Sequence, residues 1–106
     1  MARYLIEASY SPDGMKGVLA KGGVARREAV EKMLSDLGGH VESFDFAFGD
    51  TDAYVLCDVP DNVSAAAVGM AVGASGMASC KTIVLLSPEE IDRAAQLTVS
   101  YRAPGS

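Results

Sequence analysis

Three side chains that can exchange protons lie on segments that the sequence predicts to be neighbouring β-strands. Glu7 lies in an alternating segment near the N-terminus, Tyr54 in the second arm of a predicted hairpin, and Lys81 in a later strand. Because side chains alternate along a strand, all three are predicted to share one face of the sheet. A carboxylate, a phenol and an ammonium in one cleft can perform acid–base chemistry. A solvated face or a dimer interface with paired charges explains the same residues.

A second charged group surrounds a predicted helix start. Four basic side chains flank the Gly22-Gly23 pair: Lys16, Lys21, Arg26 and Arg27. Anions bind at helix N-termini, where backbone N–H groups lack partners and the helix dipole is positive. The spacing does not match a phosphate-binding loop, so a solvated helix start is the competing interpretation. A ligand held between the sheet face and this helix start would contact Lys16 and Arg27.

The remaining reactive residues are expected to be structural. His40 is the one histidine of the chain, and without a second histidine we predict neither a metal site nor a catalytic triad. Cys57 and Cys80 stand singly and form no CxxC spacing. This usage indicates reduced, buried thiols in a cytoplasmic protein. No pattern in the chain identifies a cofactor.

A β-hairpin at residues 44–60 positions Tyr54. Apolar and polar residues alternate on both sides of a turn at residues 49–52, which is typical of a hairpin. The pairs expected on the apolar, helix-covered face are Phe48–Ala53, Phe46–Val55 and Phe44–Cys57. The opposite face then receives Asp45, Tyr54 and Asp58. A slip of one residue would exchange the two faces.

The flanking segments complete one α+β domain, residues 1–106. They predict strands at 3–10 and 77–86, and helices around 15–19, 24–37, 63–74 and 88–99. This order matches a ferredoxin-like βαββαβ fold with an additional C-terminal helix. Right-handed crossovers would place the first and third strands at the centre of a four-stranded antiparallel sheet. All helices would then cover one face and leave the other bare.

Bulk properties exclude some partners. A net charge of −5 and a pI near 4.6 argue against nucleic acid and anionic membrane surfaces. Residues 63–80 contain no charged side chain and approach the length of a membrane span. Because they are mostly Ala, Gly, Ser and Val, they predict a buried helix followed by a strand. The N-terminus passes straight into a strand containing Arg3 and Glu7, so no signal peptide is expected.

The chain resembles the GYD-domain proteins, a small bacterial family grouped with the dimeric α/β-barrel proteins. The matching segments are YLIEASYSPDGMKG, GGVARREAV, LGGHVESFDFAFGDTDAYVL, DVPDNVSAAA, ASGMASCKTIVLLSPEE and YRAPG. The family signature in the hairpin turn is FGxYD. Gly49 and Asp52 match it, whereas Thr51 stands where tyrosine is usual. The resemblance implies a ferredoxin-like protomer whose sheet packs against a second copy, and it adds Asp52 to the candidate residues.

Two functional hypotheses follow, and the first leaves catalysis open. The first is a homo-oligomer that binds a small molecule at the sheet face. Its candidate ligand-binding residues are Glu7, Lys16, Arg27, Asp52, Tyr54 and Lys81. The second is a non-enzymatic assembly module, since no nucleophile–base pair, metal spacing or cofactor fingerprint is present. A cofactor-free monooxygenase or isomerase would be an analogy by fold alone.

Overall fold

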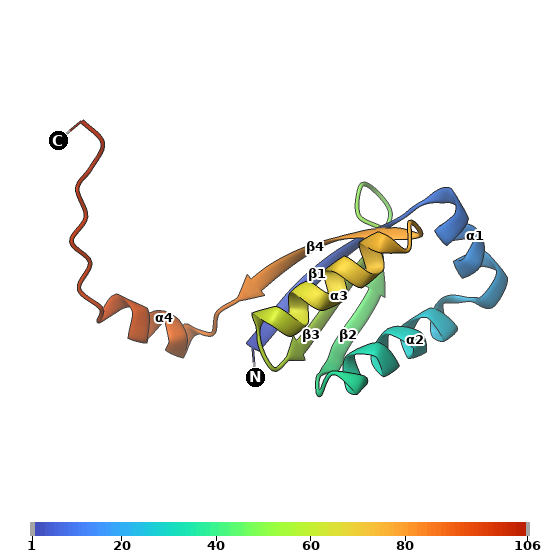
Figure 1. Ribbon diagram of the computed structural model, residues 1–106, viewed down its shortest axis with the longest axis horizontal. Coiled ribbons are helices and arrows are strands. Elements are labelled where there is room, and N and C mark those ends of the chain that lie inside the picture. Colours follow the sequence, from blue (N-terminus) through green and yellow to red (C-terminus); the bar gives the residue numbers. More distant parts are fainter. Residues whose placement is uncertain (1, 106) are drawn as a thin grey trace.

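The computed structural model describes residues 2–105 (Figure 1). Along the chain, the elements are β1 (Ala2–Tyr10), α1 (Pro12–Lys21), α2 (Gly23–Asp36), β2 (His40–Phe46), β3 (Ala53–Val59), α3 (Asn62–Ala74), β4 (Ala78–Leu85) and α4 (Pro88–Ala95). The strands form one antiparallel sheet in the order β2-β3-β1-β4. This arrangement confirms the predicted α+β, ferredoxin-like fold with β1 and β3 at the centre.

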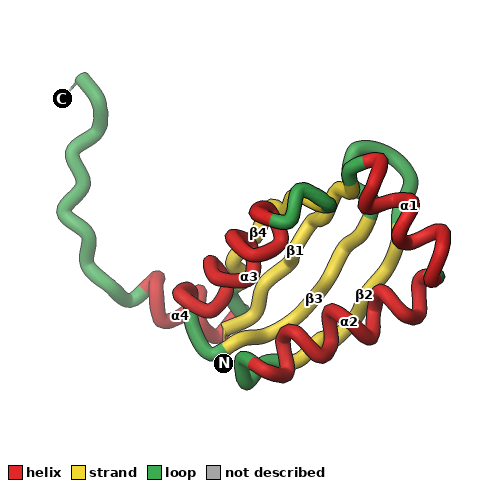
Figure 2. The backbone as a smooth tube through the Cα atoms, turned by 45° about the vertical axis from the view of Figure 1, so that its right-hand side comes forward, coloured by secondary structure: helices red, strands yellow, loops and turns green. Residues whose placement is uncertain are grey.

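Helices α2 and α3 lie over the same face of the sheet, and α1 lies at one end of it (Figure 2). We call the opposite side of the sheet the open face, because no helix of the described residues covers it (Figure 2). The uncharged stretch at residues 63–80 consists of most of α3 and the beginning of β4, as predicted. Within residues 2–105, no helix has the length and apolar character needed to cross a membrane.

The hydrophobic core fills the space between the sheet and the two covering helices. Alternation along β1 and β3 turns one set of side chains toward α2 and α3. The buried cluster consists of Tyr4, Ile6, Val30, Leu34, Val55, Cys57, Val59, Ala65 and Val68. The buried Tyr4 hydroxyl donates a hydrogen bond to Asn62 Oδ1 at the start of α3, so its polar group is satisfied.

Three helices begin at a side-chain cap and one does not. The side chains of Ser11, Asp61 and Ser87 each accept a backbone N–H bond in the first turn of α1, α3 and α4. Helix α2 instead follows Gly22, whose positive φ of 89° ends α1 and separates the two helices. The predicted glycine break is confirmed, and it leaves the N-terminus of α2 without a side-chain cap.

The hairpin register differs from the prediction by two residues. Phe46 pairs with Ala53, and Phe44 pairs with Val55, so β2 ends before the predicted turn begins. The loop at residues 47–52 closes the hairpin instead. In it, the Ala47 N–H donates to the Asp52 carbonyl at 2.8 Å, and the Asp52 N–H donates to the Ala8 carbonyl at 2.9 Å. A shift of two residues keeps the side chains that remain in β2 and β3 on their predicted faces.

The predicted core position of Phe48 is therefore wrong. Phe48 lies in the loop and its side chain is fully exposed. Phe46 is the last aromatic residue of the hairpin on the helix-covered side, where its ring lies beside Gly23 at the start of α2. The ring of Phe44 lies 5.2 Å from that of Phe46, between centroids, and packs against the buried core.

A β-bulge at Glu42 changes the other end of the hairpin. Pairing passes from Val41–Cys57 directly to Ser43–Leu56, so Glu42 has no partner in register. The extra residue places His40 opposite Asp58, whereas the unbulged prediction paired Ser43 with Asp58. The bulge therefore brings an imidazole to the edge of the open face.

The C-terminal segment projects away from the sheet and its helices (Figure 1). Helix α4 ends at Ala95, so the prediction of a helix to about Val99 is wrong. The β-branched Thr98 and Val99 favour extended backbone, and a helix without tertiary packing ends early. Ile91, Leu97 and Val99 are exposed on this arm.

We expect Leu34→Ala to lower the free energy of unfolding by about 2–5 kcal/mol, because a fully buried side chain leaves a cavity. Leu19→Ala is the matched control, since Leu19 is 80% exposed on α1 and should cost less than about 0.5 kcal/mol. Urea denaturation of the two variants measures both values. Equal losses would contradict the assignment of the core.

Candidate functional site

A row of polar side chains crosses the open face on all four strands. In register, Asp45 lies opposite Tyr54, Tyr54 opposite Glu7, and Glu7 opposite Lys81. We call these four residues the polar row. Side chains directly opposite one another on one face of an antiparallel pair have Cβ atoms about 4.5–5.5 Å apart. Glu7 therefore lies between a phenol and an ammonium. The row as a whole combines two carboxylates, one phenol and one ammonium.

A largely apolar row borders the polar row. Its members are Ser43, Leu56, Leu5 and Ile83, again in register across the four strands. Ile83 is 41% exposed and Tyr54 is 38% exposed, so both rows are accessible to a partner or ligand in a single chain. A polar group beside an exposed apolar surface is the usual composition of a binding surface.

The hairpin loop reaches the polar row from one end. Thr51 Oγ1 donates to Glu7 Oε1 at 3.3 Å, and Ser9 Oγ donates to the Asp50 carbonyl at 2.9 Å. The residue that replaces the usual tyrosine of the turn signature thus contacts the central carboxylate of the row. Asp52 has a different task, because its Oδ2 accepts the Tyr10 N–H at 2.8 Å and closes the end of β1.

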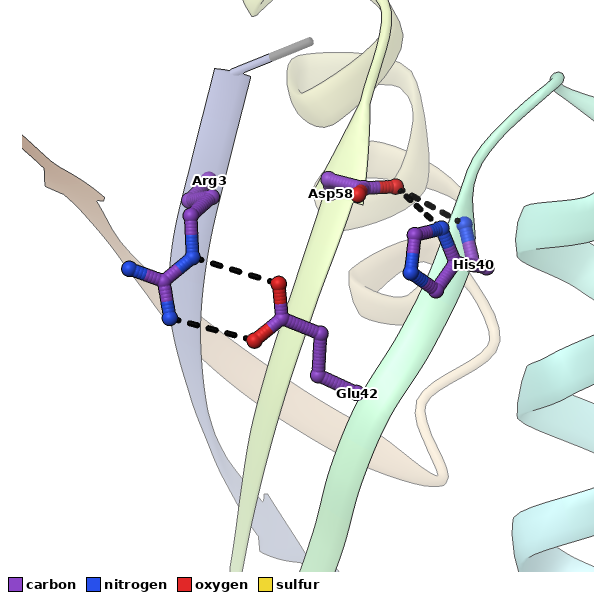
Figure 3. Close-up of polar contacts among 4 residues, drawn as sticks. All are labelled: Arg3, His40, Glu42 and Asp58. Carbon is purple, nitrogen blue, oxygen red and sulfur yellow. Dashed lines mark hydrogen bonds and ion pairs between the residues drawn. The ribbon is translucent and has the colours of Figure 1, made fainter.

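A second polar cluster lies at the far end of the open face (Figure 3). Arg3 donates to both carboxylate oxygens of Glu42, at 3.2 Å and 3.1 Å. This bidentate bond lowers the pKa of Glu42 and raises the pKa of Arg3. His40 Nδ1 lies 2.8 Å from Asp58 Oδ1, which also accepts the His40 backbone N–H at 3.2 Å.

The residue types of this cluster include metal ligands. One ligand atom each from His40, Glu42 and Asp58 lies within 4.8 Å of the others. However, Glu42 uses both oxygens for Arg3, and the guanidinium opposes the approach of a cation. We therefore describe the cluster as a polar network that contains one ion pair, Arg3–Glu42. Its geometry depends on the bulge at Glu42, which the sequence analysis did not predict.

Lys16 and Arg27 lie apart from the polar row. Lys16 is on α1 and its Nζ lies 3.9 Å from Asp13, while Arg27 is on α2 and lies 3.8 Å from Glu31. Both are helix residues with solvent-exposed side chains, whereas Glu7, Tyr54 and Lys81 are on strands of the open face. Within one chain, the structure brings together three of the six candidate residues and not the other three.

The basic helix start borders a cavity instead. A space of about 610 Å³ lies between α1, α2, α3 and the ends of β1 and β4. Arg26 and Lys21 line it, whereas Lys16 and Arg27 do not. Arg26 Nε donates to the Tyr10 hydroxyl at 3.4 Å, with its guanidinium carbon 5.6 Å from the centre of the Tyr10 ring. In the sequence, Arg26 and Arg27 belong to the same basic helix start. The helix geometry turns Arg26 toward the cavity and Arg27 away from it.

The two thiols are unsuited to nucleophilic catalysis. Cys57 is buried, and burial raises the pKa of its thiol to about 11. Burial also raises the pKa of Cys80, which is partly accessible. Because the thiolate is the reactive form, both side chains remain neutral and weakly reactive near neutral pH.

The fold and the composition of the open face define an α+β protein of the ferredoxin-like class. The chain belongs to the GYD domain family, whose model matches residues 4–95 of the 106. A search of curated proteins and a search of solved structures gave no significant match. The family assignment agrees with the resemblance seen in the sequence.

We expect iodoacetamide at pH 8 to leave Cys57 unmodified in the folded protein, because its thiol is both buried and neutral. Cys80 should react faster than Cys57, since it is partly accessible. Peptide mass spectrometry measures the labelling of each cysteine, and the same reaction in urea, where both should be labelled, is the control. Faster labelling of Cys57 than of Cys80 would be incompatible with the buried position.

Proposed function

We propose that this protein is a homodimer that binds a small organic acid between the open faces of two sheets. The observation that carries the proposal is the polar row at the middle of an uncovered sheet face, bordered by exposed apolar side chains. We place the protein in the cytoplasm, because Cys57 and Cys80 are both free thiols.

The distribution of apolar surface supports self-association. Leu5, Leu56 and Ile83 form an apolar strip on a sheet face that no helix within residues 2–105 covers. Antiparallel sheets tolerate a solvated face when that face is polar, but an apolar strip favours burial. A second copy offers an identical surface, so a two-fold dimer buries both strips at once. The exposed apolar residues of the α4 arm provide further contact area.

The polar row supports ligand binding at this interface. Face-to-face packing would bring two polar rows together and remove them from water. Lys81 has no carboxylate within 4.0 Å among residues 2–105, and Glu7 accepts a hydrogen bond from Thr51 alone. A buried ammonium without a partner is costly. A ligand carboxylate beside Lys81 would pair with its ammonium, and Tyr54, two strands away, can donate a hydrogen bond to another part of the ligand.

A non-enzymatic assembly module is the second candidate function. The cluster at the far end of the open face favours it, because Arg3–Glu42 and His40–Asp58 satisfy one another within one chain. Such preformed pairs can enter an interface without a ligand. The two functions share the dimer and differ in whether the polar row holds a molecule.

We expect Ile83→Asp to shift the protein from dimer to monomer, because it buries an uncompensated charge in the proposed interface. Sedimentation equilibrium measures the association. Leu19→Asp is the matched control, since it introduces the same charge at an exposed position of α1. A wild-type protein that sediments as a monomer at high concentration would remove the basis of the proposal.

We expect a thermal-shift screen of metabolites and aromatic acids to yield compounds that raise the Tm of the wild-type protein. Lys81→Met and Tyr54→Phe should weaken that stabilisation, because each removes one donor to the ligand. The matched control is Lys32→Met, which removes a lysine of α2 paired with Asp36. If the dimer forms but no compound raises its Tm, the assembly module is the better description.

A further inference from the structure

We infer that the cavity between α1, α2 and α3 is a second ligand site, which accepts a molecule with an aliphatic tail and one carboxylate. The cavity lies on the helix-covered side of the sheet and is built within one chain. It is therefore separate from the open face, and its occupation does not require the proposed dimer.

The size and lining of the cavity suit a small apolar molecule. Its volume of about 610 Å³ is within the range of ligand pockets, roughly 300–1,000 Å³. Most of the wall is aliphatic or sulfur-containing: Val18, Ala25, Ala29, Met33, Val72 and Met77. Methionine side chains adapt to the shape of a bound apolar group.

The cavity borders a groove between α2 and α3. Ala29, Met33 and Ala71 line both spaces, and the groove extends past Val68 to Leu37. A linear aliphatic chain that begins in the cavity can therefore follow the groove along the two helices. This shape favours an extended tail over a compact ring system.

Arg26 provides the polar end of the site. Its guanidinium lies over the Tyr10 ring and donates one N–H to the Tyr10 hydroxyl. No carboxylate of residues 2–105 lies within 4.0 Å of Arg26, in contrast to its neighbour Arg27. A guanidinium presents several N–H donors in a planar fork that fits a carboxylate. Tyr10 holds that fork at the wall of an apolar cavity.

The other charged groups at the cavity leave it electropositive. Lys21 lies on the wall, and the uncapped N-terminus of α2 adds the positive end of a helix dipole. Asp13 also lines the cavity, but its carboxylate is 3.9 Å from Lys16. The balance favours an anionic head group over a neutral or cationic one.

Gly17 lies on the cavity wall, and no neighbouring atom requires a glycine at this position. A Cβ at Gly17 would meet no atom within 4 Å, whereas a Cβ at Gly14 would clash with the Met77 carbonyl. Gly17 lies inside α1, where glycine is less favourable than most residues. A larger side chain at this position therefore meets no steric obstacle near its Cβ, and because Gly17 lines the cavity, it should narrow that space.

Octanoate is the probe, and isothermal titration calorimetry measures its dissociation constant for the full chain. We expect octanoate to bind the wild-type protein, and octanol to bind at least about tenfold more weakly because it lacks the charge that Arg26 recognises. Arg26→Gln should weaken octanoate by about tenfold or more and leave octanol unchanged. Arg27→Gln is the matched control and should bind octanoate as the wild type does.

Gly17→Leu tests the location by shape. It should abolish octanoate binding, whereas Gly73→Leu should preserve it, because Gly73 is a helical glycine with equal space outside the cavity. Circular dichroism confirms that each variant is folded, and the Arg26→Gln comparison stands if a leucine variant is not. Lys81→Met should leave octanoate binding intact, which separates this site from the open face.

Three results would overturn the inference. They are the absence of octanoate binding to the wild type, equal effects of Arg26→Gln and Arg27→Gln, and a loss of octanoate binding in Lys81→Met. The first two results would exclude the ligand site in the cavity between α1, α2 and α3, and they would leave the proposal for the open face unchanged. The third would move the ligand to the open face.

Discussion

The pairing of β1 between β3 and β4 is the constraint on which the other features depend. One side of β1 contributes Tyr4 and Ile6 to the core, so the register is held by buried apolar surface. The same register sets Glu7 between Tyr54 and Lys81 on the opposite side. A slip of one residue would expose the core side chains of β1 and would also separate Glu7 from Tyr54 and Lys81. Packing on one face of the strand thus fixes the chemistry of the other face.

Local patterns were sufficient for the order of elements and for the faces of the strands. Alternation and turn residues predicted the sheet, its central strands and the shared face of Glu7, Tyr54 and Lys81. They did not predict the hairpin register, because the loop is closed by a bond from Asp52 to Ala8, which is distant in sequence. The bulge at Glu42 also has no local signature, and the bulged residue bonds to Arg3, which is distant in sequence.

The basic helix start shows a similar limit. Arg26 and Arg27 are equivalent in composition, yet consecutive helix residues point about 100° apart. One therefore stacks on Tyr10 at the wall of a cavity, and the other pairs with Glu31 on the helix surface. The family signature needs the same care, because Thr51, at its tyrosine position, reaches the polar row while its aspartate, Asp52, closes a strand end. In both cases, the three-dimensional neighbours decide which residue of a motif is available to a ligand.

The bulge at Glu42 also affects how copies of the chain can meet. Strand β2 is an edge of the sheet, and an edge with free backbone groups can recruit a strand from another molecule. The bulge interrupts the regular spacing of those groups, and charged residues occupy the same edge. Both features disfavour edge-to-edge extension into a continuous sheet along β2. The bulged residue of the polar network thus also works against open-ended association of the chain at this edge.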